Sequence, residues 1–284
     1  MVWLWCARLA WVTLPVTTGD ALAEALDGWE RAPSLVATTI LWAAWMSGLV
    51  ALLAPRPWGL TLLRVVAPAT IGVNAAAFAD LGTSSAMVAV SASVVATTCA
   101  LSAPVAEAAG NALAYGDERR YPLRIPTPLL AAPVPVAVAA VAAPALAPLL
   151  LAAGEPTAGV LLLVLGTPVA LVLLRALHSL ARRWVVLVPA GVVIVDPLTL
   201  VDPVLVRREL VERLGPPSGA RDALDLRLGT TTGTLELHTR EPATFLRRSG
   251  RAGGALVQAD TVLVAPVRPA ALLAAARARR IRVG

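Results

Sequence analysis

The chain has 284 residues, of which 57% are hydrophobic and 15% charged, and its mean hydropathy is +0.74. Soluble domains carry about 25% charged residues, so the composition argues against a soluble protein and predicts a multi-pass membrane protein. The net charge of +6 is uneven, because residues 1–183 hold ten Arg and nine acidic residues, whereas residues 184–284 hold fourteen Arg and nine acidic residues.

A membrane-spanning helix needs roughly 20 apolar residues. Five stretches meet this requirement, residues 34–54, 60–78, 83–104, 128–153 and 157–177. Residues 1–18 form a weaker sixth, because Arg8 and Pro15 interrupt them. A signal peptide is the rival interpretation, but no charged residue precedes the apolar run and no small-x-small site follows it. We therefore expect an all-α membrane bundle of about six transmembrane helices in residues 1–181.

Charged residues in the connecting segments orient these helices. Residues 19–33 carry four acidic residues and one Arg, whereas the opposite side carries Arg56, Arg119, Arg120, Arg124, Arg182 and Arg183. Because Arg is enriched in cytoplasmic loops, we expect an inner-membrane protein with both termini in the cytoplasm. The expected boundaries also carry aromatic residues, namely Trp58, Tyr115, Tyr121 and Trp184 inside and Trp29 outside.

Residues 182–197, RRWVVLVPAGVVIVDP, contain one further apolar run. Only twelve residues separate Arg183 from Asp196, which is about 18 Å as a helix against a hydrocarbon core of about 30 Å. Pro189-Ala190-Gly191 at the centre is a turn signal between runs of Val and Ile, which prefer strands. We therefore predict a β-hairpin of residues 184–188 and 192–195 that opens a small cytoplasmic α+β domain, residues 182–284.

The rest of this domain is predicted from shorter patterns. Asp202 as an N-cap, Pro203 after it and Gly215 as a stop favour a short helix over residues 202–214, while the β-branched content allows a strand. Leucines alternate with polar residues over 224–228 and 235–238 on either side of a Gly/Thr turn, which predicts a hairpin. ALVQADTVLVAPV predicts a further strand and RPAALLAAARARRI a closing helix.

The segment VLVAPVRPAALLAAARA, a strand followed by the final helix, resembles bacterial pleckstrin-homology-like (PH-like) domains attached to membrane anchors. The phrases WVTLPVTTGDALAEAL and LTLLRVVAPA resemble uncharacterised actinobacterial multi-pass membrane proteins. The resemblance implies a strand barrel closed by a C-terminal helix, from which a helix after Asp202 would depart. It does not carry over lipid recognition, because the first hairpin loop, PAG, has no basic residue.

Motifs for catalysis, nucleotides or metals are not apparent in the sequence. Cys6 and Cys99 are far apart, and His178 and His238 lie in different regions, so we expect no zinc site, disulfide framework or cofactor. GTTTG, residues 229–233, suggests a phosphate loop but stands in hairpin context. Acid–base candidates are expected to be solvated side chains at turns or on polar strand faces, namely Asp196, Asp202, Asp222, Asp225, Glu236 and His238. We expect a protein that is not an enzyme.

Polar residues inside expected spans are candidate functional groups. These are Arg64, Asn74, Glu107 and Asn111. In a transporter they would line a polar path. In the structural interpretation, Arg64 extends to the inner headgroups, and Glu107 and Asn111 lie in a helix that continues into the cytoplasm.

A second set of candidates is basic. Contact with anionic lipid is expected for Arg119, Arg120, Arg182, Arg183, Arg277, Arg279, Arg280 and Arg282. The leading interpretation is a non-catalytic scaffold or regulatory protein that binds an unidentified partner protein, and no nucleic acid, through residues 184–284. The alternative is a small-solute transporter or permease component.

Overall fold

A computed structural model describes residues 2–219, 222–250 and 253–284. The chain divides into two compact units, a helical unit of Met1–Ala109 and Val134–His178 and a mixed unit of Gly110–Pro133 and Ser179–Gly284. The sequence predicted a single boundary between residues 181 and 182. The mixed unit therefore also contains Gly110–Pro133, a segment that the sequence placed between two membrane helices.

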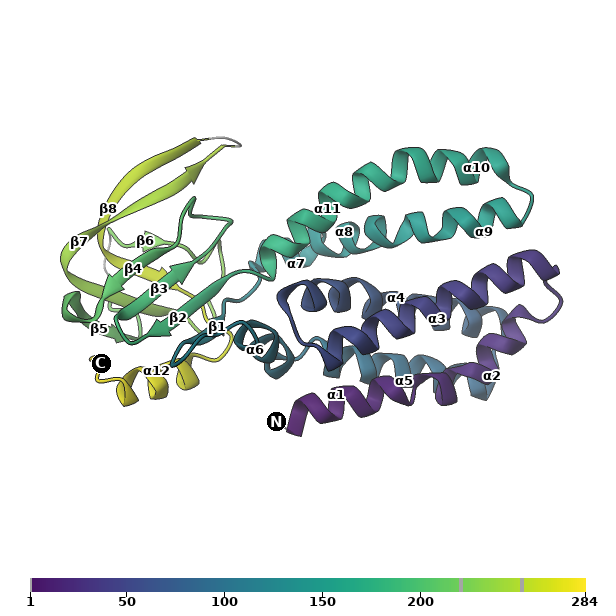
Figure 1. The fold of residues 1–284 in the computed structure, drawn as a ribbon, viewed down its shortest axis with the longest axis horizontal. Helices are drawn as coiled ribbons and strands as arrows, with labels where there is room; N and C mark the ends of the chain where they lie inside the picture. The colour runs from purple at the N-terminus through teal and green to yellow at the C-terminus, as the bar shows by residue number, and fades with distance from the viewer. Residues whose placement is uncertain (1, 220–221, 251–252) are drawn as a thin grey trace. The chain divides into compact units, whose positions relative to one another are not determined.

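Helices make up the first unit (Figure 1). They are α1 (Val2–Val12), α2 (Leu14–Leu26), α3 (Arg31–Leu53), α4 (Pro57–Leu81), α5 (Ser84–Ala100), α6 (Ala103–Asn111), α8 (Pro133–Ala142), α9 (Ala147–Ala152), α10 (Pro156–Leu161) and α11 (Thr167–Leu180), of which α6 and α11 end in the mixed unit. A 3-10 turn, Ala143–Leu146, joins α8 to α9, and a π-helical segment, Leu162–Gly166, joins α10 to α11.

Four continuous helical stretches in the described residues are long and apolar enough to cross a membrane. They are Arg31–Leu53, Pro57–Leu81, Pro133–Ala152 and Pro156–Leu180. A fifth candidate is the pair α5 and α6, which is bent by 46° at a short break. The prediction of a helical membrane-type region is confirmed at this level, and the structure supports four or five candidate spans.

The N-terminal stretch is divided into two short helices. α1 ends at Val12 and α2 begins at Leu14, with Pro15 in its first turn. Proline lacks an N–H and so cannot donate to the carbonyl four residues earlier. Neither helix reaches the length of a span by itself, so a sixth crossing requires α1 and α2 to act together.

Small residues allow α5 to pack closely against its neighbours. Its buried positions are Ala86, Ala89, Ser93, Ala96, Thr97 and Ala100. Thr97 Oγ1 donates a 2.8 Å hydrogen bond to the carbonyl of Ala67 in α4. Membrane helices commonly associate through such small-residue faces and interhelical hydrogen bonds.

The mixed unit contains two four-stranded sheets. The first sheet, ordered β1-β2-β3-β4, is fully antiparallel and consists of β1 (Arg119–Pro122), β2 (Trp184–Val188), β3 (Gly191–Val195) and β4 (Val204–Arg207). The second, ordered β5-β7-β8-β6, consists of β5 (Val211–Gly215), β7 (Leu235–Ser249), β8 (Gly253–Val264) and β6 (Leu224–Asp225). Helices α7 (Thr127–Ala131) and α12 (Pro269–Ala278) complete the unit.

Both sheets and α12 share one hydrophobic core. Leu187 and Ile194 of the first sheet, Leu237 of the second, Phe245 of the long β7 strand and Leu272 of α12 are almost completely buried within it. Alternation along β7 places Leu235 and Leu237 in this core and sends the residues between them to the other face. The prediction of a C-terminal α+β domain is confirmed.

The predicted hairpin at the start of this domain is also confirmed. β2 pairs with β3 from Trp184 with Val195 to Val188 with Gly191. Trp184, however, does not mark a membrane boundary, because it is 4% exposed and its ring lies against Gly110. A Cβ atom on Gly110 would stand 2.5 Å from Trp184 Cζ3, so only glycine fits there.

Two favoured predictions about the middle of the domain are wrong. Residues 202–214 form strands, the alternative that their β-branched content allowed, and not the favoured helix: β4 pairs with β3, β5 pairs with β7, and a 3-10 turn, Arg208–Leu210, lies between them. Residues 224–228 and 235–238 do not form a hairpin, because β6 pairs in parallel with β8 and has no ladder with β7. In both cases pairing with distant strands overrides the local pattern.

An edge strand comes from the loop between α6 and α7. β1 pairs with β2, Arg119 opposite Leu187 and Pro122 opposite Trp184. Asn111 closes the free edge of β1, since its Nδ2 donates to the carbonyl of Arg120 and its Oδ1 accepts from the Arg120 N–H, both at 2.9 Å. The sheet is therefore built from two chain segments separated by the whole α7–α11 region.

Candidate functional site

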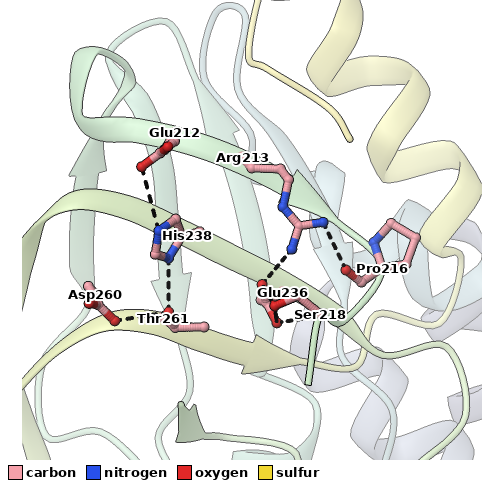
Figure 2. A network of polar contacts seen from close by, with 8 residues as sticks. All are labelled: Glu212, Arg213, Pro216, Ser218, Glu236, His238, Asp260 and Thr261. Atoms are coloured by element: carbon pink, nitrogen blue, oxygen red, sulfur yellow. Dashed lines mark hydrogen bonds and ion pairs between the residues drawn. The ribbon is translucent and has the colours of Figure 1, made fainter. Parts of the chain in front are cut away.

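Polar side chains gather on the outer face of the second sheet. In the register, Arg213 of β5 lies opposite His238 of β7, and His238 lies opposite Thr261 of β8. Glu236 lies two residues before His238 and therefore on the same face. We call the residues drawn as sticks in Figure 2, namely Glu212, Arg213, Pro216, Ser218, Glu236, His238, Asp260 and Thr261, the outer-face cluster.

His238 stands at the centre of a chain of contacts across three strands (Figure 2). Its Nδ1 lies 2.9 Å from Thr261 Oγ1, and its Nε2 lies 3.5 Å from Glu212 Oε2. Thr261 donates its hydroxyl proton to Asp260 Oδ1 at 2.9 Å, so Nδ1 of His238 must be the donor toward Thr261. The second ring nitrogen then carries a proton only in the imidazolium form, which pairs with Glu212.

This arrangement resembles a hydroxyl–imidazole–carboxylate triad in composition but not in chemistry. A nucleophilic hydroxyl must give its proton to the imidazole, whereas the proton of Thr261 is directed to Asp260. Thr261 is also 3% exposed, so no substrate reaches it. The cluster holds three strands together and does not present an activated nucleophile.

Glu236 is a buried carboxylate with a full set of donors. It is 2% exposed and accepts from Arg213 Nη2 at 2.5 Å, from the Ser218 N–H at 2.8 Å and from the Ser218 hydroxyl at 2.8 Å (Figure 2). Burial raises the pKa of Glu236, but the hydrogen bonds from Ser218 and Arg213 more than offset this and hold it below its usual value. The expectation of a solvated Glu236 is therefore wrong.

A second buried ion pair joins Arg183 to Asp196. Arg183 Nε donates to Asp196 Oδ1 at 2.8 Å and Nη2 to Oδ2 at 2.7 Å, with both side chains at most 2% exposed. The remaining donors bind the carbonyls of Arg124 and Leu226. The guanidinium thus ties three separate segments of the mixed unit together. Asp196 is therefore not a solvated residue, and the buried Arg183 is not exposed for contact with lipid.

The other acid–base candidates are not brought together. Asp225 pairs with Arg227, two residues away, at 2.7 Å, and hydrogen bonds from Arg227 hold the pKa of Asp225 below its usual value. Asp202 and Asp222 are exposed. Within the described part of the chain, no three His, Cys, Asp or Glu residues form a cluster that could hold a metal ion.

The polar residues expected within the membrane serve different roles. Asn74 Nδ2 donates to Ser93 Oγ and to the carbonyl of Thr70, both at 2.9 Å, and so joins α4 to α5. Asn111 binds the backbone of β1 instead of facing a helix bundle. Arg64 is half-buried in α4 and Glu107 half-buried in α6. The hydrogen bonds of Asn74 thus lie within α4 and α5, whereas Asn111 binds the backbone of Arg120.

Some of the basic candidates bind other groups of the protein, and others are exposed at its surface. Arg120 pairs with Glu118 at 2.6 Å, and Arg279 donates to the carbonyl of Asp117. The exposed members are Arg119, Arg182, Arg277, Arg280 and Arg282.

Sequence reasoning missed a feature at the far end of the long β7–β8 pair. Residues 243–249 of β7 pair with 253–259 of β8 beyond the reach of β5 and β6, and we call this two-stranded segment the β7–β8 arm (Figure 1). Leu256 on the arm is 75% exposed, and its register partner Leu246 is half-buried. The signal was present in the sequence as the run FLRRSGRAGGALV, in which leucines flank a glycine-rich stretch.

One side of the arm is fixed by the segment after β3. The N–H of Val201 donates to the carbonyl of Leu246 at 2.9 Å, and the N–H of Arg248 donates to the carbonyl of Thr199 at 2.8 Å. Val201 is itself 39% exposed. The arm therefore presents an ordered apolar patch of Val201, Leu246 and Leu256 beside Arg248.

Comparison of the chain with models of protein families, with curated proteins and with solved structures finds no match in any of the three.

Proposed function

We propose that the protein is a membrane-anchored, non-catalytic adaptor whose mixed unit binds a partner protein in the cytoplasm through the β7–β8 arm. The observation that carries this proposal is Leu256, a leucine 75% exposed on an ordered two-stranded arm. Large apolar residues grouped on a folded surface are typical of contact sites for other proteins. The outer-face cluster, by contrast, is used within the fold.

The charge of the arm indicates the kind of partner. Residues 243–259 contain three Arg and no acidic residue, and the structure places Arg247 and Arg248 at exposed positions. A partner with an apolar patch bordered by carboxylates would complement this surface. We therefore propose that the arm binds an acidic surface on the partner protein.

The membrane arrangement is part of the same proposal. Six crossings require α1 and α2 to form one interrupted span and α5 with α6 another. The excess of Arg in the segments around Arg56 and residues 119–124 supports an inner-membrane protein whose mixed unit lies on the cytoplasmic side. The exposed Arg119, Arg182, Arg277, Arg280 and Arg282 would add contact with anionic lipid.

A PH-like architecture is proposed for the mixed unit. Two four-stranded sheets around one core with a helix near the C-terminal end support it. The segment after Asp202 consists of strands, so it agrees with the strand barrel of a PH-like domain, from which a helix would have departed. The resemblance to actinobacterial multi-pass proteins remains a resemblance of sequence phrases.

A transporter or permease component is the second candidate, favoured by the buried Nη1 of Arg64 in α4. Substitution Glu107→Gln would then change solute uptake in proteoliposomes. Unchanged flux would count against transport.

Site-specific photo-crosslinking in cells tests the adaptor proposal on the full-length protein. A photoreactive residue at position 256 should give one discrete protein adduct, identified by mass spectrometry, and Arg248→Glu should abolish it. Position 205 is the matched control, because Leu205 of β4 is 47% exposed outside the arm. Equal labelling from positions 205 and 256 would contradict the assignment. Adducts with lipid alone would show that the arm contacts the bilayer and not a partner protein.

A further inference from the structure

Arg64 occupies an unusual position in α4. It lies seven residues after Pro57, which is about 10 Å along the helix. Pro57–Leu81 is one of the helices long and apolar enough to span a membrane. Arginine remains protonated in proteins, so this helix carries a permanent positive charge inside its apolar length.

The guanidinium of Arg64 is not neutralised within the described chain. Its Nη1 is buried and has no hydrogen-bond partner there. In the described residues Arg64 forms no ion pair, whereas Arg120, Arg183, Arg213 and Arg227 each pair with a carboxylate. An unpaired buried charge is strongly unfavourable, and proteins normally surround such a group with an anion.

The polar residues next to Arg64 on α4 do not supply this anion. Thr61 lies three residues earlier and therefore on the same face of the helix. Its hydroxyl donates to the carbonyl of Pro57 at 3.0 Å and lies 2.9 Å from Nδ1 of His178. Since the hydroxyl proton is directed to Pro57, the imidazole is the donor toward Thr61. Thr61 and His178 thus satisfy each other, and neither brings a negative charge.

We propose that Arg64 binds a phosphate oxyanion, which comes either from a phospholipid headgroup or from a phosphate-bearing solute. The planar guanidinium fork matches the oxygens of such an anion. The depth is suitable, because the exposed Trp58 near the start of α4 is a residue type that marks membrane interfaces. The headgroup region is about 5–8 Å thick on each side of the hydrocarbon core, so placing Trp58 at the interface would put the Arg64 side chain within reach of lipid phosphates. The inference is independent of the β7–β8 arm.

Thermal unfolding of the full-length protein in micelles of an uncharged, phosphate-free maltoside detergent tests this site. The arms are the micelles alone, the micelles with added phosphatidylglycerol, and the micelles with inorganic phosphate against chloride at matched ionic strength. The variants are Arg64→Met and the control Arg56→Met, which removes an exposed Arg at the beginning of the same helix. We expect at least one anion to raise the midpoint of the wild type by about 5 °C.

In the phosphate-free micelles alone, Arg64→Met should be more stable than the wild type, because it removes an unpaired buried charge. The rise with anion should vanish in Arg64→Met and persist in Arg56→Met. A response to phosphatidylglycerol alone identifies a lipid headgroup, and a response to inorganic phosphate identifies a solute site. The proposal is overturned if no anion stabilises the wild type, if Arg64→Met responds equally, or if Arg56→Met also loses the response. If Arg64→Met does not fold, Arg64→Lys is the deciding variant. A rise in its unfolding midpoint with anion as large as that of the wild type would exclude binding by the guanidinium fork.

Discussion

Trp11 and Trp45 exchange two hydrogen bonds. Nε1 of each indole donates to the main-chain carbonyl of the other at 2.9 Å, which joins α1 to α3. The carbonyl of Trp11 is available because residue 15 is a proline and cannot donate the helical hydrogen bond to it. The indole of Trp45 thus replaces the backbone donor that Pro15 removes.

The substitution Trp45→Phe should therefore destabilise the helical unit by about 1–2 kcal/mol, because the buried carbonyl of Trp11 loses its donor. Pro15→Ala restores an N–H four residues after Trp11 and should recover part of the loss. A double-mutant cycle of unfolding free energies in detergent measures this coupling. Strictly additive effects of the two substitutions would show that Pro15 and Trp45 do not act on the same carbonyl.

Gly48 is expected to be essential for the same contact. A Cβ atom at Gly48 would stand 2.1 Å from Cζ2 of Trp11, which is completely buried. Gly48→Ala should cost about 1–3 kcal/mol through overpacking, whereas Gly72→Ala in α4 meets no atom within 4 Å and should be neutral or slightly stabilising. The two thermal midpoints provide the comparison, and equal midpoints would contradict the packing described for Trp11.

The Arg183–Asp196 pair predicts an asymmetric response to substitution. Asp196→Asn leaves the buried guanidinium without its carboxylate and should cost about 3–5 kcal/mol. The double variant Arg183→Met with Asp196→Leu removes both charges and should be more stable than Asp196→Asn alone. Chemical denaturation monitored by tryptophan fluorescence measures both. A double variant as unstable as the single one would mean that the hydrogen bonds to Arg124 and Leu226 matter more than the ion pair.

Acid should weaken the mixed unit through Glu236. The pKa of Glu236 is lowered in the folded state, so its contribution to stability is fully present above the unfolded pKa of about 4.3 and is lost as the pH falls through the folded value. Glu236→Gln should flatten this part of the stability–pH curve, which equilibrium denaturation at a series of pH values records. Asp202→Asn is the control, because it removes an exposed carboxylate of the same unit. A slope unchanged by Glu236→Gln would assign the acid sensitivity to other groups.

The elements that sequence predicted well are those whose signals are local. The β2–β3 hairpin follows from Pro189-Ala190-Gly191 between two β-branched runs, and α12 follows from an apolar face introduced by Pro269. The strand within residues 253–264 likewise ends in the β-branched and apolar run TVLV, residues 261–264. These elements need no knowledge of a partner strand.

The elements that sequence mispredicted depend on distant partners. Asp202 and Pro203 are a helix-start signal, yet β4 and β5 extend to pair with β3 and β7. Asp196 and Glu236 read as solvated carboxylates, because nothing near them in sequence shows that Arg183 and Arg213 approach them in the fold.

Strand β1 depends most on a distant partner, because it lies more than sixty residues before β2 in the sequence. A fragment that begins at β2 would therefore lack it. β2 lies between β1 and β3, so a fragment of residues 184–284 would expose the edge of β2 that β1 covers. It would also lose Leu123 from the core, as well as Arg183 and the Arg124 carbonyl that this guanidinium binds. An uncovered strand edge is a site of aggregation. We expect this fragment to aggregate.

A fusion that restores β1 should instead fold. Leu123 donates to the carbonyl of Arg183 at 3.0 Å, so a short Gly/Ser linker can join residues 110–126 to 182–284 in place of the helices between them. This fusion should be monomeric and unfold cooperatively, as measured by size-exclusion chromatography and circular dichroism. Asn111→Ala in the fusion should weaken it by about 1 kcal/mol, because the Arg120 backbone loses its two hydrogen bonds at the outer edge of β1. A soluble, cooperative fragment of residues 184–284 would show that β1 is dispensable and that the mixed unit begins at β2.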